Sequence, residues 1–151
     1  MSYAKFFQQT LLLIIQDQAL NAGKCGYVYA ERGRCQDATV YLSMVKDALI
    51  ETLGCENAKT MTATLGLAGT YWGLGRLEEA IVLQKRVVEA RSRVFGPEHR
   101  ETLLAMDQLG RSYWLHRQYN EALKLQQLTT DRMKAVLGPE DDDTLAALDN
   151  L

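Results

Sequence analysis

The sequence has few of the residues that build covalent frameworks or metal sites. Its 151 residues contain three cysteines and two histidines, and none falls at the paired spacing of a zinc site or a disulfide framework. Only two prolines interrupt the chain, so long helices can form. An odd number of cysteines is typical of a reducing compartment, which predicts a cytoplasmic location without a metal or cofactor.

An excess of one charge and long apolar runs are also absent. The formal net charge of −2 gives no general attraction for nucleic acid or anionic membranes. The longest run of large aliphatic residues, Leu11–Ile15, is far shorter than the roughly 20 residues that span a bilayer. The chain start also lacks the basic segment and cleavage site of a signal peptide. We therefore expect no nucleic-acid or membrane partner.

The chain instead contains an internal repeat with a period of 42 residues. Residues 54–95 and 96–137 align without a gap, and twelve aligned positions are identical, among them Tyr71 with Tyr113 and Trp72 with Trp114. A third copy begins at Gly138 and runs to residue 151, and a diverged copy fills roughly 12–53. A fixed period in this range is typical of stacked repeat arrays.

Each copy has the apolar spacing of two amphipathic helices. Steps of three and four residues dominate both halves, and the glycine-rich segment 73–76 supplies a tight turn between them. Gly-Pro-Glu at 96–98 and 138–140 ends one helix and prevents its continuation. Helices are predicted near 14–32, 36–52, 58–74, 78–94, 101–116 and 120–136, with a stub from 143 and a helical segment before 14.

These patterns resemble the tetratricopeptide repeat, specifically the long variety of kinesin light chains and the arrays of fungal nucleotide-binding sensor proteins. The family pattern of leucine, small residue, two variable residues and tyrosine occurs at 67–71 and 109–113. The turn glycine is Arg117 in one copy, a departure from the pattern. The resemblance implies an all-α fold, an α-solenoid of stacked antiparallel helix pairs in a right-handed superhelix. Small residues, Ala80 and Ala122, are expected where paired helices touch.

The repeat predicts a single domain over 1–151. Its parts are a capping segment at 1–11, the diverged repeat at 12–53, full repeats at 54–95 and 96–137, and a truncated repeat at 138–151. An apolar patch at 6–15 reads either as a cap on the first repeat or as an interface. Because Leu145, Leu148 and Leu151 lack a second helix to pack on, we expect a piece of a longer array, an end covered by another chain, or a loosely ordered stub.

No catalytic motif was found. Gly73 and Gly75 lack the remainder of a phosphate-binding loop, and the acidic run at 140–143 reads as helix-start residues and lacks the pattern of a calcium loop. Basic residues on the second helix of a copy, Arg91 among them, were expected on a solvated outer face. We therefore expect no enzymatic activity.

The resemblance places a partner on the first helix of each pair, which lines the concave side. The expected groove residues are Tyr27, Glu31, Leu65, Trp72, Asp107, Arg111 and Trp114. Tryptophan and arginine are favoured in binding hot spots. The alternative for both tryptophans is burial between adjacent helices. The predicted function is a protein-binding module for a peptide or partner helix, and the alternative is a segment that self-assembles through its apolar start or its open end.

Overall fold

The structure, a computed structural model, describes residues 35–151, and every regular element in this part of the chain is an α-helix. The helices are α2 (Cys35–Leu53), α3 (Ala58–Gly73), α4 (Leu77–Val94), α5 (Arg100–Leu115), α6 (Tyr119–Val136) and α7 (Asp142–Asp149). The bounds of α2 to α6 and the start of α7 lie within one residue of their predicted positions. The predicted helix at 14–32 and the capping segment at 1–11 fall outside the described residues.

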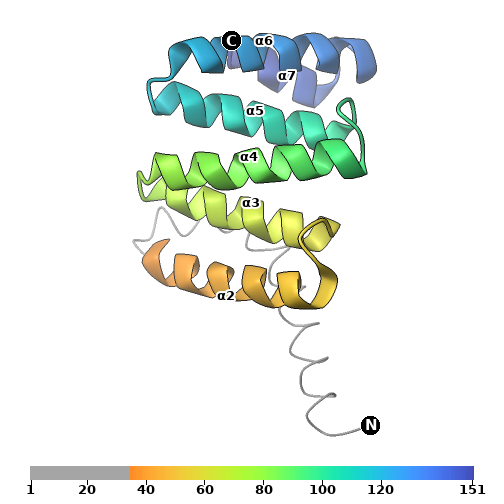
Figure 1. Cartoon of the computed structure of the whole chain (residues 1–151). Helices are drawn as coiled ribbons and strands as arrows, with labels where there is room; N and C mark the ends of the chain where they lie inside the picture. Colours follow the sequence, from red (N-terminus) through yellow and green to blue (C-terminus); the bar gives the residue numbers. More distant parts are fainter. Residues whose placement is uncertain (1–34) are drawn as a thin grey trace, which may run out of the picture. The chain divides into compact units, whose positions relative to one another are not determined.

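The chain divides between Leu74 and Gly75 into two compact units. In the first unit, α2 packs on α3 through Val45, Leu49 and Ala63, and the hydroxyls of Thr39 and Thr70 are 3.2 Å apart. In the second unit, α5 lies between α4 and α6, and α7 lies beside α6 (Figure 1). Neighbouring helices in the second unit are joined by short loops, which favours the antiparallel pairing that the repeat predicted.

The first helix begins with the same local structure in the three copies that start at residues 54, 96 and 138. Asn57, His99 and Asp141 occupy one repeat position, and the side chain of each accepts a hydrogen bond from the backbone N–H two residues later, at 2.9, 3.2 and 3.0 Å. These bonds satisfy one of the N–H groups that a helix start leaves without a partner. The three caps explain why α3, α5 and α7 all start at the same repeat position.

The turn between paired helices needs left-handed backbone, whatever residue supplies it. Gly75 has a φ of 73°, and Arg117 at the same position of the next copy has a φ of 62°. A residue with a side chain loses about 1–2 kcal/mol in left-handed backbone. Arg117, which stands where the family pattern has glycine, therefore lowers the stability of the fold. The two helix ends predicted at Gly96 and Gly138 also have positive φ, in agreement with their role as breakers.

The second unit is held together by one apolar cluster and one close helix contact. Leu103, Met106, Met133 and Ala147 form the cluster, which joins α5, α6 and α7. Ala122 is fully buried, and a Cβ added at Gly110 would lie 2.8 Å from Cγ of Gln126. The α5–α6 pair therefore approaches closely enough to require small residues at these positions, as the repeat pattern predicted for Ala122.

Candidate functional site

The structure groups the predicted groove residues into two sets. Leu65, which is half-buried, and Trp72 lie on α3 in the first unit. Asp107, Arg111 and Trp114 lie on α5 in the second unit, spaced by four and three residues and thus on one face of the helix. Tyr27 and Glu31 lie outside the described residues.

Both tryptophans have substantial exposed surface. Trp72 is 37% exposed and Trp114 is 52% exposed, so neither is enclosed between helices within this chain. The Trp114 ring meets the edge of the Tyr119 ring with 4.9 Å between centroids and an interplanar angle of 68°. This contact fixes one side of the indole and leaves the rest of its surface open.

Asp107 and Arg111 form an ion pair that also involves α7. Nε of Arg111 lies 3.4 Å from Oδ2 of Asp107, whose side chain is only 14% exposed. Burial raises the pKa of Asp107, whereas the charge of Arg111 and a hydrogen bond from Asn150 oppose the shift. The carboxylate is therefore already engaged inside the chain, and Arg111, with 42% of its side chain exposed, is the member of the pair that can reach a partner.

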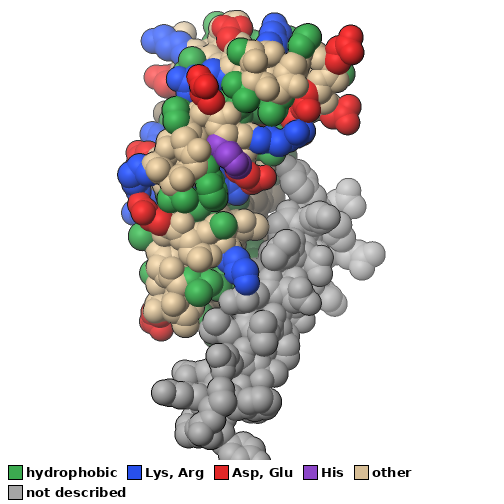
Figure 2. Space-filling model, turned by 90° about the vertical axis from the view of Figure 1, so that its right-hand side faces the viewer, with side chains coloured by type: hydrophobic (Ala, Val, Ile, Leu, Met, Phe, Trp, Pro, Cys, Tyr) green, Lys and Arg blue, Asp and Glu red, His purple; other side chains and the backbone are tan. Residues whose placement is uncertain are grey.

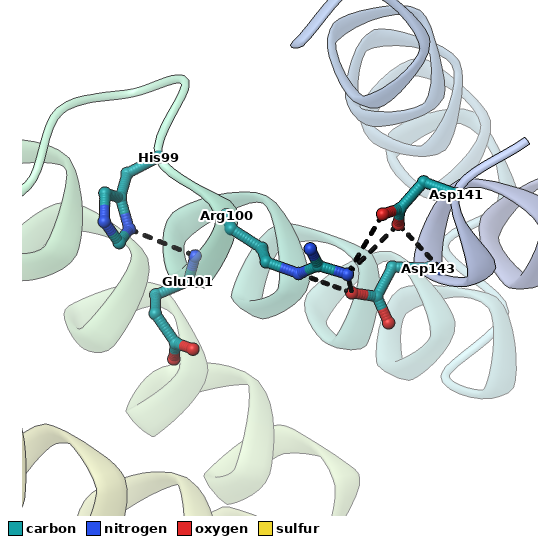
Figure 3. A network of polar contacts seen from close by, with 5 residues as sticks. All are labelled: His99, Arg100, Glu101, Asp141 and Asp143. Carbon is teal, nitrogen blue, oxygen red and sulfur yellow. Dashed lines mark hydrogen bonds and ion pairs between the residues drawn. The ribbon is translucent and has the colours of Figure 1, made fainter. Parts of the chain in front are cut away.

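A second polar network joins the starts of α5 and α7 (Figure 3). Nε of Arg100 donates to Oδ2 of Asp143 at 2.8 Å, and its Nη2 donates to Oδ1 of Asp141 at 3.1 Å. The hydrogen bond to Asp143 and the charges of both aspartates raise the pKa of Arg100. The acids predicted to favour a helix start thus also anchor α7 to the preceding repeat.

Charges of both signs are interspersed over the surface shown in Figure 2, including its upper part, where α6 and α7 lie.

Within residues 35–151, no group of three histidine, cysteine, aspartate or glutamate side chains is arranged to hold a metal ion. In the same part of the chain, no helix combines the length and the apolar character needed to cross a membrane.

Comparison with known proteins assigns the repeat. A tetratricopeptide repeat family profile matches residues 59–135, just over half of the chain. The chain belongs to the tetratricopeptide repeat family. No curated protein sequence matches this tetratricopeptide repeat chain.

Solved structures match this tetratricopeptide repeat chain over most of its length. A Podosopora anserina protein described as a kinesin light chain, with nearly identical TPR-like repeats, has a TM-score of 0.80 and 24% identity, covering 90% of this chain and 64% of its own. BtubC (BKLC) from P. vanneervenii has a TM-score of 0.76 and 18% identity, covering 98% and 62%. This chain thus spans less than two thirds of either protein. The likeness confirms the all-α solenoid class.

One tetratricopeptide repeat residue was wrongly placed by the sequence. Arg91 was expected on a solvated outer face, but its side chain is 7% exposed. Its Nη1 donates to the backbone carbonyl of Glu101 at 2.8 Å, and its Nη2 lies 3.2 Å from Oε2 of the same residue. Burial lowers the pKa of Arg91. The alignment of the copies indicated that position 91 is buried, because the same position in the next copy is the apolar residue Met133. Met133 is fully buried in the structure.

Arg100 was missing from the predicted site for a different reason. Its partners lie 41 and 43 residues further along the chain, on a different helix. A single copy of a tetratricopeptide repeat gives no indication of such a contact. These separations are close to one repeat period. The contact could therefore have been predicted by pairing opposite charges at the starts of two consecutive copies.

Proposed function

We propose that this chain is a protein-binding module that takes a peptide or a short helix of another protein along the first helices of its repeats. Tetratricopeptide repeats generally mediate protein–protein interactions, and scaffolds of this kind are typically not enzymes. The observation that carries the proposal is the pairing of Arg111 and Trp114 on one face of α5, each with a large exposed fraction.

The two side chains offer complementary chemistry. The contact with Asp107 uses Nε of Arg111, so the terminal amino groups remain to donate to a partner carboxylate. Trp114, steadied by Tyr119, offers a flat apolar surface beside that donor. A partner segment that carries an acidic residue and an apolar residue about one helical turn apart fits both groups.

The remaining predicted residues extend the proposal to the other repeats. Leu65 and Trp72 on α3 are assigned the corresponding role in the first unit, and Tyr27 and Glu31 are assigned it in the diverged repeat. The module would act in the cytoplasm as part of a longer repeat array. The small net charge supports a protein partner over nucleic acid or an anionic membrane surface.

The test separates binding from folding. Immobilised wild type, Arg111→Ala, Trp114→Ala and the control Leu128→Ala are each exposed to extract from the native host, and retained proteins are then purified and titrated. Leu128 lies on α6 and is 44% exposed. The proposal expects Arg111→Ala and Trp114→Ala each to weaken one partner by about 1–3 kcal/mol, with thermal unfolding near that of wild type.

Two outcomes would contradict the proposed site. The first is a partner retained equally by all four proteins, because its contact would then lie elsewhere. The second is a large loss of thermal stability in Trp114→Ala, because the indole would then act mainly in packing. The Leu128→Ala control shows how much any exposed apolar truncation contributes.

A further inference from the structure

Asp107 places a carboxylate at a repeat position that does not require one. The same positions as Asp107 and Arg111 are held in the preceding copy by Leu65 and Gly69. Both Leu65 and Asp107 are partly buried, so the two side chains have similar surroundings in this respect. A copy of the repeat can therefore be built with an apolar side chain here. The charge of Asp107 needs a reason other than the fold.

The carboxylate of Asp107 is held at a cost. Its side chain is 14% exposed, and burial raises its pKa, which means that the ionised form is less favoured than in water. The negative charge of Asp143 on α7 acts in the same direction. A leucine would avoid both effects, because a buried apolar side chain needs no partner. The carboxylate is thus kept for a contact that leucine cannot make.

That contact holds one edge of the Arg111 guanidinium. Nε of Arg111 lies 3.4 Å from Oδ2 of Asp107 and is enclosed, although 42% of the side chain as a whole is exposed. Among residues 35–151, the two terminal amino groups of Arg111 are neither enclosed nor engaged in a hydrogen bond. The Nε edge of the guanidinium therefore faces the chain, and its Nη end is open to a partner.

Asp107 is itself held by the following copy of the repeat. The side chain of Asn150, at the end of α7, makes a hydrogen bond to the Asp107 carboxylate. Asn150 has the repeat position of Gln108, so this donor belongs to the copy that starts at residue 138. The carboxylate is fixed from two directions, by the amide of Asn150 on α7 and by the charge of Arg111 on α5. Two consecutive copies thus contribute to one arrangement.

We propose that Asp107 is the positioning residue of the proposed partner site, which holds Arg111 with its Nη end toward the partner, and that Asn150 orients Asp107 for this role. This inference rests on the proposed function, in which Arg111 is the partner contact. A guanidinium that is ordered before binding loses less conformational freedom when the partner arrives. A partner carboxylate meets both Nη groups at the end away from Asp107, so repulsion between the two carboxylates is reduced.

The test is made on the free chain by nuclear magnetic resonance, which follows hydrogen exchange of the arginine Nε–H groups. Arg111→Lys removes one signal and so identifies that of Arg111. In wild type, the Nε–H of Arg111 should exchange about tenfold more slowly than that of Arg86, an exposed arginine of α4, because Nε of Arg111 is enclosed beside a carboxylate. Asp107→Asn keeps the shape of the side chain and should remove most of this protection. Asn150→Ala should remove part of it.

A second variant separates positioning from folding. Asp107→Leu reproduces the residue of the preceding copy, so it should unfold at a temperature no lower than that of wild type. The same variant should lose the protection of the Arg111 Nε–H, because the carboxylate beside it is gone. A residue that served only the fold would show the opposite pattern, with lower stability and an unchanged Arg111 signal.

A pH series gives a readout that a purely structural role would not change. As the pH falls through the pKa of Asp107, which burial raises from its ordinary value, the carboxylate gains a proton and its attraction for Arg111 is lost. The exchange rate of Arg111 relative to that of Arg86 should therefore rise over the interval in which Asp107 titrates. This rise should be absent from Asp107→Asn.

Four results would overturn the proposal. They are equal exchange of Arg111 and Arg86 in wild type, protection of Arg111 that survives in both Asp107 variants, full protection in Asn150→Ala, and a rise at low pH that persists in Asp107→Asn. None of these measurements needs a partner. A failure of the proposed function, seen as a partner retained equally by the Arg111→Ala variant, is therefore distinguished from a failure of this inference.

Discussion

The contact between α4 and α5 and the contact between α6 and α7 each join one copy to the next at the same repeat position, but they use different chemistry. We call them the first step and the second step. In the first step, the buried guanidinium of Arg91 holds the first turn of α5 through Glu101. In the second step, Met133 replaces Arg91 and packs against Ala147, and Asp143 replaces Glu101 and pairs with Arg100 of α5. The backbone step is kept while the polar contact moves from a buried site to an exposed one.

The comparison shows which part of a repeat is fixed by packing and which part is free to vary. Ala122 and Gly110 are constrained because the helices of a pair approach closely there. The polar contact between copies has no such constraint. The start of α5 is bound by an arginine of the preceding helix, Arg91, whereas the start of α7 is bound by an arginine two helices back, Arg100. A buried ion pair is weak evidence for added stability, and an apolar replacement can serve as well.

The largest effect is expected where packing is closest. Ala122→Glu places a charge in a fully buried position between α5 and α6 and should cost about 3–5 kcal/mol, enough to unfold much of the second unit. Leu123→Glu, one residue later, should change stability by less than about 1 kcal/mol because that side chain is exposed. Urea unfolding of both variants measures the difference, and equal midpoints would mean that the assigned helix pairing is wrong.

The next effect compares Ile81 on α4, which is 5% exposed, with Leu123 at the same repeat position on α6, which is 54% exposed. Ile81→Ala removes a buried side chain and should lower the free energy of unfolding by about 2–4 kcal/mol. Leu123→Ala at the equivalent position should lower it by no more than about 0.5 kcal/mol in dilute solution. Thermal unfolding of the two variants, measured at low protein concentration, tests this. Similar losses would show that the two faces are equally covered.

A smaller effect is expected at the polar contact of the first step. Glu101→Ala leaves Arg91 buried without its carboxylate and should cost about 1–2 kcal/mol, since the backbone carbonyl of residue 101 still accepts a hydrogen bond. Arg91→Met copies the second step and should stay within about 1 kcal/mol of wild type. Combining the two changes should cost less than Glu101→Ala alone. A full additive loss in a double-mutant cycle would contradict the interchangeability of the two steps.

The smallest effect concerns the turns. Arg117→Gly relieves a left-handed side chain and should raise stability by about 0.5–1 kcal/mol. Gly75→Arg makes the reverse change at the equivalent turn and should lower stability by a similar amount. Differential scanning calorimetry can resolve both shifts. Opposite signs from those expected would show that contacts of the Arg117 side chain outweigh its backbone strain.

The sequence predicted the helices closely because their signals are local. Apolar spacing, the glycine breakers and the residues before each helix act within a few positions, and they placed both ends of α2 to α6 and the start of α7 within one residue. Arg91 was misplaced because a single helix does not reveal which of its sides a later helix covers, although the buried Met133 one period later carried that information.

The candidate site was predicted less completely, because it depends on contacts between copies. The sequence left open whether Trp114 is exposed or buried between helices, and the structure shows that it is half exposed. The engagement of Asp107 by Asn150 and of Arg100 by Asp143 joins residues about one period apart.

The three helix caps serve one repeat position with three different side chains. Asn57 accepts its hydrogen bond through a neutral amide, which gains no proton in the ordinary pH range. His99 accepts through Nδ1 of its imidazole, and Asp141 accepts through a carboxylate oxygen at the positive end of α7. The start of each of these helices therefore depends on an acceptor at one repeat position and not on one residue type, so the copies can diverge there while the backbone keeps the same helix start.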